Sequence, residues 1–167
     1  MKILLPADLL SILKDSHLLL DTNVFIDTFL NPTEFGKFIN QLRENRITLV
    51  TIDVVRFEFL KGAPNLQKHK EKEELIERII DAYLPIQKDI LDNADKLLQL
   101  YKEDGKAISI TDLLLGATLM HYKTNLSLIT KNTTDFPTNI FTLVTYINLL
   151  HRKGIHTYGV YQSISAK

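Results

Sequence analysis

The sequence predicts an α/β domain in which a central, mostly parallel sheet is flanked by helices in a three-layer arrangement. Four short segments are apolar at nearly every position, which is typical of strands covered on both faces. Segments with the apolar spacing of amphipathic helices lie between them. The chain has 167 residues, of which 45% are hydrophobic, and this is enough for one domain with a sizeable core.

The predicted strands are short. Leu18 to Leu20 is the first, and RITLVTI, residues 46–52, is the second. LSLIT, residues 126–130, is the third, and IFTLVTY, residues 140–146, is a fourth with partial alternation. Strands that alternate with helices favour parallel pairing.

Helices are predicted where apolar residues recur at spacings of three and four. The segments are residues 32–44, 54–62, 66–84, 88–101 and 110–123. Thr111 is the predicted N-cap of the last helix. The charged run at 67–75 is interpreted as a solvated helix face, with Lys70 and Glu74 at i,i+4 spacing. A contact surface for a partner or RNA is the alternative.

Composition excludes several classes of protein. Twenty Lys and Arg residues balance twenty Asp and Glu residues, which disfavours a broad polyanion binder of the histone type. The chain has no cysteine, so disulfides and thiolate zinc sites are excluded. Pro6, Asp8, Lys14 and Asp15 interrupt the apolar stretch that a secretory signal requires. No window reaches the roughly 20 apolar residues of a membrane-spanning helix, so we expect a cytoplasmic protein.

Acidic residues follow the predicted strands, where ligands bind in open α/β sheets. Asp21 comes directly after the first strand, and Asp135 lies just beyond the third. Asp112 begins a helix beside it. Glu58 stands between two phenylalanines early in the helix after the second strand. A glutamate is rarely buried among aromatic side chains without a partner, so we expect Glu58 to have a function.

Each aspartate alone has an ordinary structural explanation. Asp21 can cap a helix, Asp112 can stabilise a helix N-terminus, and Asp135 can form a turn. Four carboxylates at one edge, however, need a counter-charge, because like charges at close range raise each other's pKa. Mg²⁺ or Mn²⁺ supplies that charge through oxygen ligands. Metal-assisted attack of water on a phosphodiester is the chemistry that fits such a site.

Four motifs place these acids in a known context. LLLDTNVFI, RFEFLKG, SITDLLLGATL and LITKNTTDF occur in the order of the four acidic motifs of the PIN-domain ribonucleases. The chain resembles this family over roughly residues 18–146. It is similar in particular to the toxin subunits of bacterial and archaeal VapBC-type toxin–antitoxin pairs. DTN after an apolar strand, together with TKNTTDF downstream, is the most specific part of the resemblance.

The resemblance implies a Mg²⁺- or Mn²⁺-dependent endoribonuclease whose catalytic pocket contains Asp21, Glu58, Asp112 and Asp135. The three aspartates are the implied metal ligands, direct or through water, and Glu58 completes the site or orients the attacking water. Four polar neighbours are expected to hydrogen-bond to these acids. They are Thr22, Asn23, Thr130 and Asn132.

Partners follow from the same resemblance. It implies an RNA substrate, an antitoxin whose C-terminal segment occupies the acidic cleft, and a homodimer. Basic residues at the rim are expected to contact RNA. These are Arg56, Lys61, Lys131 and the region 68–72.

We expect residues 1–167 to form one PIN domain with three additional regions. Residues 1–16 are an N-terminal extension with a helix predicted at 6–14, which could serve dimerisation. Residues 63–87 form a helical arm that, by resemblance, meets the antitoxin and shapes the RNA entrance. Residues 147–167 form a C-terminal segment.

Other classes fit less well. A phosphotransferase of the haloacid-dehalogenase type needs a second aspartate two residues after the first, where this chain has Asn23. A receiver-like domain would use Lys131 but leaves Glu58 unexplained. The strongest alternative is a non-catalytic PIN-like module that binds RNA or protein, although all four motif positions are acidic here. The histidines follow no metal-ligand spacing; they are His17, His69, His121, His151 and His156.

Overall fold

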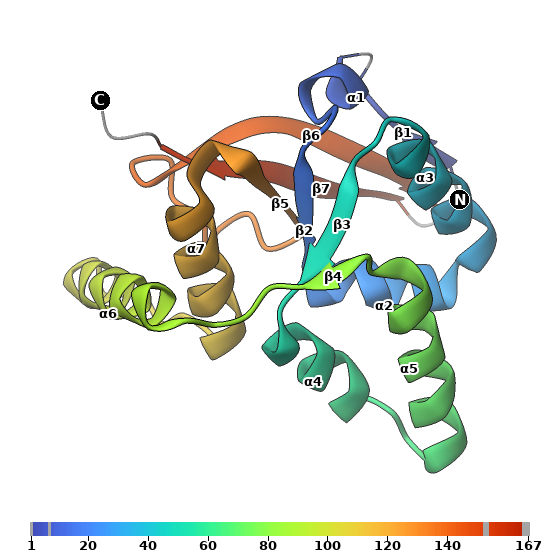
Figure 1. Ribbon diagram of the computed structural model, residues 1–167, viewed down its shortest axis with the longest axis horizontal. Coiled ribbons are helices and arrows are strands. Elements are labelled where there is room, and N and C mark those ends of the chain that lie inside the picture. The colour runs from blue at the N-terminus through green and yellow to red at the C-terminus, as the bar shows by residue number, and fades with distance from the viewer. Residues whose placement is uncertain (1, 7, 152–153, 165–167) are drawn as a thin grey trace.

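The computed structural model describes residues 2–6, 8–151 and 154–164 (Figure 1). Within these residues, seven strands form one mixed sheet in the order β1-β6-β7-β5-β2-β3-β4. The predicted α/β class is confirmed. The sheet has a parallel half, which holds the candidate site, and an antiparallel half, which the sequence did not predict.

The parallel half consists of β2 (His17–Leu20), β3 (Thr48–Thr51), β4 (Ala82–Tyr83) and β5 (Leu126–Thr130). β2 is central, because it pairs in parallel with both β3 and β5. All five residues of β5 are buried, as expected for an apolar run with helices on both faces. The three predicted strands of this half are confirmed, and the two-residue β4 is an addition at its edge.

The antiparallel half consists of β6 (Phe141–His151), β7 (Gly154–Ser163) and β1 (Lys2–Leu4). β7 lies between β5 and β6 and pairs antiparallel with both. β1 pairs antiparallel with the outer edge of β6. The predicted fourth strand is therefore real but longer than 140–146, and the sequence predicted neither β7 nor β1.

Helices cover both faces of the sheet (Figure 1). The crossovers β2–β3 and β3–β4 run in one direction along the sheet and the crossover β4–β5 returns, so right-handed connections place their helices on opposite faces. One face carries α2 (Thr22–Leu30), α3 (Pro32–Glu44), α4 (Asp53–Lys61) and α5 (Leu66–Ile79). On the other face α7 (Ile110–Tyr122) packs on β5 and β7, and α6 (Lys88–Glu103) packs on α7. A 3-10 turn, η1 (Lys123–Asn125), leads into β5.

Three predictions about helix ends need correction. The helix predicted at 66–84 is α5, which ends at Ile79, because Ala82 and Tyr83 form β4 beside β3. The N-cap of α7 is Ser109, whose Oγ accepts a hydrogen bond from the Asp112 amide, whereas Thr111 is buried inside the helix. The N-terminal helix is only α1 (Leu9–Ile12), shorter than the predicted 6–14.

The charged helix α5 has one buried face. Leu75, Ile76 and Ile79 belong to the core, while Lys70 and Glu74 are exposed as predicted. Lys72 differs, because it is only 8% exposed and its Nζ donates to the carbonyl oxygen of Phe59, 2.7 Å away. No helix in the described part of the chain is long and apolar enough to cross a bilayer.

Candidate active site

Asp21 lies where β2 ends and α2 begins. Its side chain is 3% exposed, and Oδ1 accepts a hydrogen bond from the Thr22 amide at 2.6 Å, so it caps the helix. Oδ2 accepts from Thr130 Oγ1 at 2.6 Å and from Asn23 Nδ2 at 3.0 Å. The end of β5 thus contacts the end of β2, as parallel pairing requires. Asp21 therefore caps α2 with one carboxylate oxygen and contacts Thr130 and Asn23 with the other.

Asp112 lies in the first turn of α7 and is 8% exposed. Its Oδ2 accepts a hydrogen bond from Ser109 Oγ at 2.5 Å and one from Asn132 Nδ2 at 3.1 Å. Ser109 was missed by the sequence analysis, although a serine three residues before an acid is the pattern of a capping box.

Asp135 follows β5 in the loop that also contains Asn132. Asn132 Nδ2 donates to Asp135 Oδ2 at 2.6 Å, and the backbone amide of Asn132 donates to Thr130 Oγ1 at 2.9 Å. The backbone oxygen of Asp135 accepts a hydrogen bond from the hydroxyl of Tyr101 on α6. Asn132 therefore joins Asp112 to Asp135, two acids from different parts of the chain.

The three aspartates act on one another electrostatically. Burial raises the pKa of Asp112 to about 6, opposed by the hydrogen bond from Ser109 and reinforced by the charges of Asp21 and Asp135. Burial also raises the pKa of Asp21 from its ordinary value, and the charge of Glu58 adds to this rise. Holding these groups ionised side by side costs free energy that a nearby cation would recover.

Glu58 is placed differently from the expectation. It is exposed, and of its two aromatic neighbours Phe57 is 60% exposed while only Phe59 is buried. The argument that Glu58 is buried among aromatics is therefore wrong. Glu58 still reaches the site, because its Oε2 accepts a hydrogen bond from Thr22 Oγ1 at 2.5 Å.

The donor set suits a hard divalent cation. The acids offer only oxygen atoms, and Thr22, Asn23, Thr130 and Asn132 all hydrogen-bond to them. In the described ranges, no group of three or more His, Cys, Asp or Glu side chains is arranged to hold one ion. An ion such as Mg²⁺ takes one or two carboxylates directly and keeps several waters. The residues present therefore fit such an ion.

The basic residues expected to contact RNA are largely engaged by other protein groups. Ion pairs join three of them to acids: Arg56 with Glu73, Lys68 with Glu71, and Lys131 with Asp27. Lys61 and Lys70 are exposed, and the Lys72 ammonium donates a hydrogen bond to the backbone oxygen of Phe59 on α4. Of the histidines, His17, His69 and His156 are exposed and His121 contacts Tyr122, while the side chain of His151 lies outside the described residues.

Comparison with known proteins agrees with this fold. A family model described as PIN domain matches residues 18–137, a span that includes all four acids. The chain therefore belongs to the PIN domain family, whose members are typically nucleases that use divalent metals.

Two solved structures are similar to the chain. The crystal structure of VapBC2 from Rickettsia felis, bound to a DNA fragment from their promoter, matches with a TM-score of 0.57 and 18% identity, over 70% of this chain and 87% of that one. The structure of VapBC-1 from nontypeable Haemophilus influenzae matches with a TM-score of 0.58 and 24% identity, over 71% and 89% of the two chains. The likeness is in the fold. No curated protein matches the sequence.

Proposed function

We propose that this protein is a metal-dependent endoribonuclease that hydrolyses RNA phosphodiester bonds in the cytoplasm. The observation that supports this most strongly is the joining of Asp112 and Asp135 by Asn132, beside the buried Asp21. Three acids from the ends of β2 and β5 and the start of α7 thereby meet at one edge of the sheet. We also propose that residues 1–167 form a single domain, and the direct pairing of β7 with β5 supports the inclusion of β6 and β7 in it.

Each residue has a defined role in this proposal. Asp21, Asp112 and Asp135 would hold Mg²⁺ or Mn²⁺, one or two of them directly and the others through water, while Thr130 and Asn132 orient their carboxylates. When bound, the cation neutralises the scissile phosphate and lowers the pKa of a water. Glu58 is exposed at the rim of the site and accepts a hydrogen bond from Thr22 Oγ1. In this proposal it orients the attacking water. The protein contributes mainly positioning.

The test is cleavage of end-labelled single-stranded and structured RNAs with Mn²⁺, with Mg²⁺ and with EDTA. We expect metal-dependent cuts that leave 5′-phosphate and 3′-hydroxyl ends, and their loss in Asp21→Asn with the fold kept. A variant that cuts as fast as the wild type would remove Asp21 from the mechanism. A folded wild type that binds RNA but neither Mn²⁺ nor Mg²⁺ would favour the non-catalytic binding module.

The proposal extends to a toxin with a cognate antitoxin and to a homodimer. Two of the solved structures with a similar fold are VapBC structures, which supports this extension. A groove of about 330 Å³ with an apolar wall lies between α2, α4 and α5. Part of its lining comes from the predicted helical arm, residues 63–87, and most of the rest from α2 and α4. Its lining includes Ile26, Phe29, Leu30 and Phe59.

Two experiments test these extensions. Growth arrest on expression, relieved by a co-expressed neighbouring gene product, would support the toxin role. Light scattering would give the mass of the assembly and so test the homodimer.

A further inference from the structure

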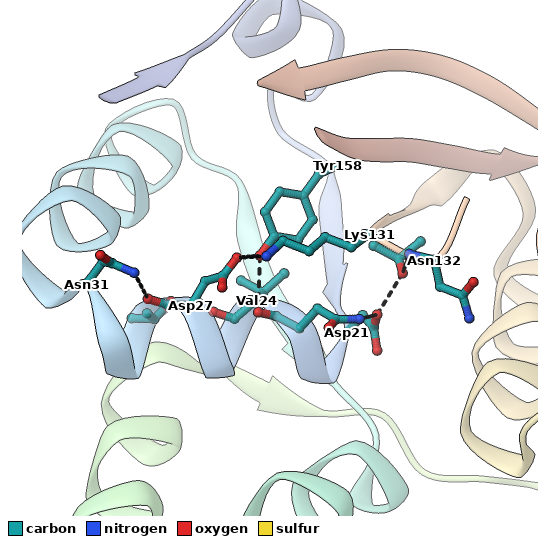
Figure 2. A network of polar contacts seen from close by, with 10 residues as sticks. Asp21, Val24, Asp27, Asn31, Lys131, Asn132 and Tyr158 are labelled. Atoms are coloured by element: carbon teal, nitrogen blue, oxygen red, sulfur yellow. Dashed lines mark hydrogen bonds and ion pairs between the residues drawn. The ribbon is translucent and has the colours of Figure 1, made fainter. Parts of the chain in front are cut away.

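Asp27, Lys131 and Tyr158 form a compact polar cluster next to the acids (Figure 2). The Tyr158 hydroxyl donates to Asp27 Oδ2 at 2.6 Å, and the Lys131 ammonium forms an ion pair with the same oxygen. The ammonium also lies 5.3 Å from the centroid of the Tyr158 ring. Tyr158 is 1% exposed, and the side chains of Lys131 and Asp27 are 24% and 15% exposed.

The cluster joins three segments that are distant in sequence. Asp27 lies on α2, Lys131 is the first residue after β5, and Tyr158 lies on β7. The Tyr158 oxygen is also 3.1 Å from the backbone oxygen of Asn23, which lies in the first turn of α2, two residues after Asp21. The segment from Asp21 to Asp27 is thus fixed to the end of β5 at two places: Thr130 contacts Asp21 before the first turn of α2, and Lys131 contacts Asp27 in the second half of the helix.

The side chains of Lys131 and Asn132, which are neighbours in one loop, point in opposite directions. Figure 2 shows the Lys131 side chain running along α2 toward Asp27 and Tyr158, while the Asn132 side chain points away from them. Asn132 makes the contacts with Asp112 and Asp135. A lysine fixed on one side of the backbone therefore limits how far the asparagine on the other side can move.

We propose that Asp27, Lys131 and Tyr158 act as one positioning unit that holds Asn132 in place between Asp112 and Asp135. This inference rests on the proposed nuclease function and adds three residues to it, none of which touches the acids. It replaces the expectation that Lys131 contacts RNA, because the Lys131 charge is already neutralised by Asp27. Tyr158 lies beyond the family match at 18–137, so this chain's own C-terminal strand supplies part of the unit.

The two roles for Lys131 predict opposite effects of Asp27→Asn. If Lys131 contacts RNA, removing Asp27 frees its charge and tightens RNA binding, so KM falls. If the unit positions Asn132, Asp27→Asn and Lys131→Met both lower kcat, by about ten-fold, with KM unchanged. If Lys131 contacts an RNA phosphate, Lys131→Met should also reduce the slope of log binding constant against log salt concentration by about 1. A raised KM in Lys131→Met with a lowered KM in Asp27→Asn would overturn the proposal.

A readout independent of cleavage is the side-chain amide of Asn132 in the metal-free protein. Its ¹⁵N-¹H signals, assigned with Asn132→Asp, should shift or broaden in Asp27→Asn, Lys131→Met and Tyr158→Phe. Lys37→Met is the matched control, because it removes an exposed ion pair with Glu34 at 3.2 Å on α3. It should leave these signals unchanged. Signals that are unmoved in all three variants would refute the positioning unit, even if the wild type proves to be a nuclease.

Two further variants distinguish a positioning role from a simple loss of folding. Tyr158→Phe keeps the ring, which packs edge-on against Phe35, and removes only the hydroxyl. The double variant Asp27→Asn/Lys131→Met leaves no unpaired charge, and for a single unit its effect on kcat should be no larger than that of either single variant. If the fold-reductions in kcat of the two single variants multiply in the double variant, the three residues do not act as one unit. If the wild type cuts no RNA, the nuclease proposal fails while the amide signals still decide the positioning role.

Discussion

Asn132 joins Asp112 to Asp135 through one side-chain nitrogen, with Nδ2 3.1 Å from Asp112 Oδ2 and 2.6 Å from Asp135 Oδ2. An amide nitrogen carries two hydrogens, so it can donate one to each carboxylate. The contact fixes the relative position of a helix start and a loop that are otherwise separate. It also partly offsets the repulsion between the two negative charges.

Replacing this amide should impair catalysis more than stability. We expect Asn132→Ala to lower kcat by about 10- to 100-fold, because both carboxylates lose the donor that orients them. The measurement is steady-state cleavage with Mn²⁺, alongside thermal unfolding. Asn139→Ala is the control, since Asn139 is exposed and lies in the same connection between β5 and β6. Equal activity of the two variants would contradict the role given to Asn132.

Asp112 should lower the stability of the metal-free protein at neutral pH. Its pKa is raised from 3.8 to about 6 in the folded state, so between these values the folded chain binds more protons than the unfolded chain. Stability therefore falls as pH rises through this window. The full difference corresponds to about 3 kcal/mol well above pH 6, and it falls to a few tenths of a kcal/mol near pH 3.5.

Asp112→Asn tests this directly. It should raise the free energy of unfolding by about 1–3 kcal/mol at pH 7.5 and leave it unchanged near pH 3.5. Urea unfolding at the two pH values, in the presence of EDTA, makes the measurement. A variant that is less stable than the wild type at pH 7.5 would show that the carboxylate is not strained there.

A divalent cation should stabilise the protein through the same group. Binding to the folded state at 100 times Kd adds about 2.7 kcal/mol, which corresponds to a rise in Tm of about 5–10 °C for a chain of this size. We expect Mn²⁺ to produce this rise in the wild type and in Glu58→Gln, whose side chain is exposed. Asp112→Asn should show little of it. An equal rise in Asp112→Asn would place the cation elsewhere.

Gly159 should not tolerate a side chain. A Cβ atom there would lie 2.4 Å from Cε2 of Tyr161, a buried ring whose hydroxyl is 3.3 Å from the backbone oxygen of Thr133 in the site loop. Gly159→Ala should therefore destabilise the protein by about 1–3 kcal/mol. Gly36→Ala is the control, because nothing lies within 4 Å of its Cβ position in α3. We expect that change to stabilise the helix by about 0.5–1 kcal/mol, and thermal unfolding compares the two.

The parallel half of the sheet was predictable because its strands are uninterrupted apolar runs. LSLIT coincides with β5, and the start of α3 at Pro32 follows from proline at the first helical position. β7 was missed because its first residues are exposed, so Gly154–Ser163 lacks both a continuous apolar run and strict alternation. β1 was missed because a three-residue edge strand has little local signal and depends on β6 for its partner.

Within the site, the acids themselves were easier to find than what holds them. Asp21 and Asp135 follow strands directly, which is a local pattern. The partner of Lys131 lies 104 positions earlier on another element, and Tyr158 comes from a strand that was not predicted. Lys131 was therefore interpreted as a free cation. Burial of Glu58 was inferred from its neighbours in sequence, but on a helix adjacent residues point in different directions.

The position of β7 in the sheet has a consequence for the order of synthesis. β7 lies between β5 and β6, and it brings Tyr158 to Asp27 and Lys131. A chain emerging from the ribosome presents all four acids well before residues 154–163 are made. The loop with Asn132 and Asp135 therefore lacks its last support until β7 is inserted. The proposed site would therefore be complete only after residues 154–163 have been made, later than the acids that it contains.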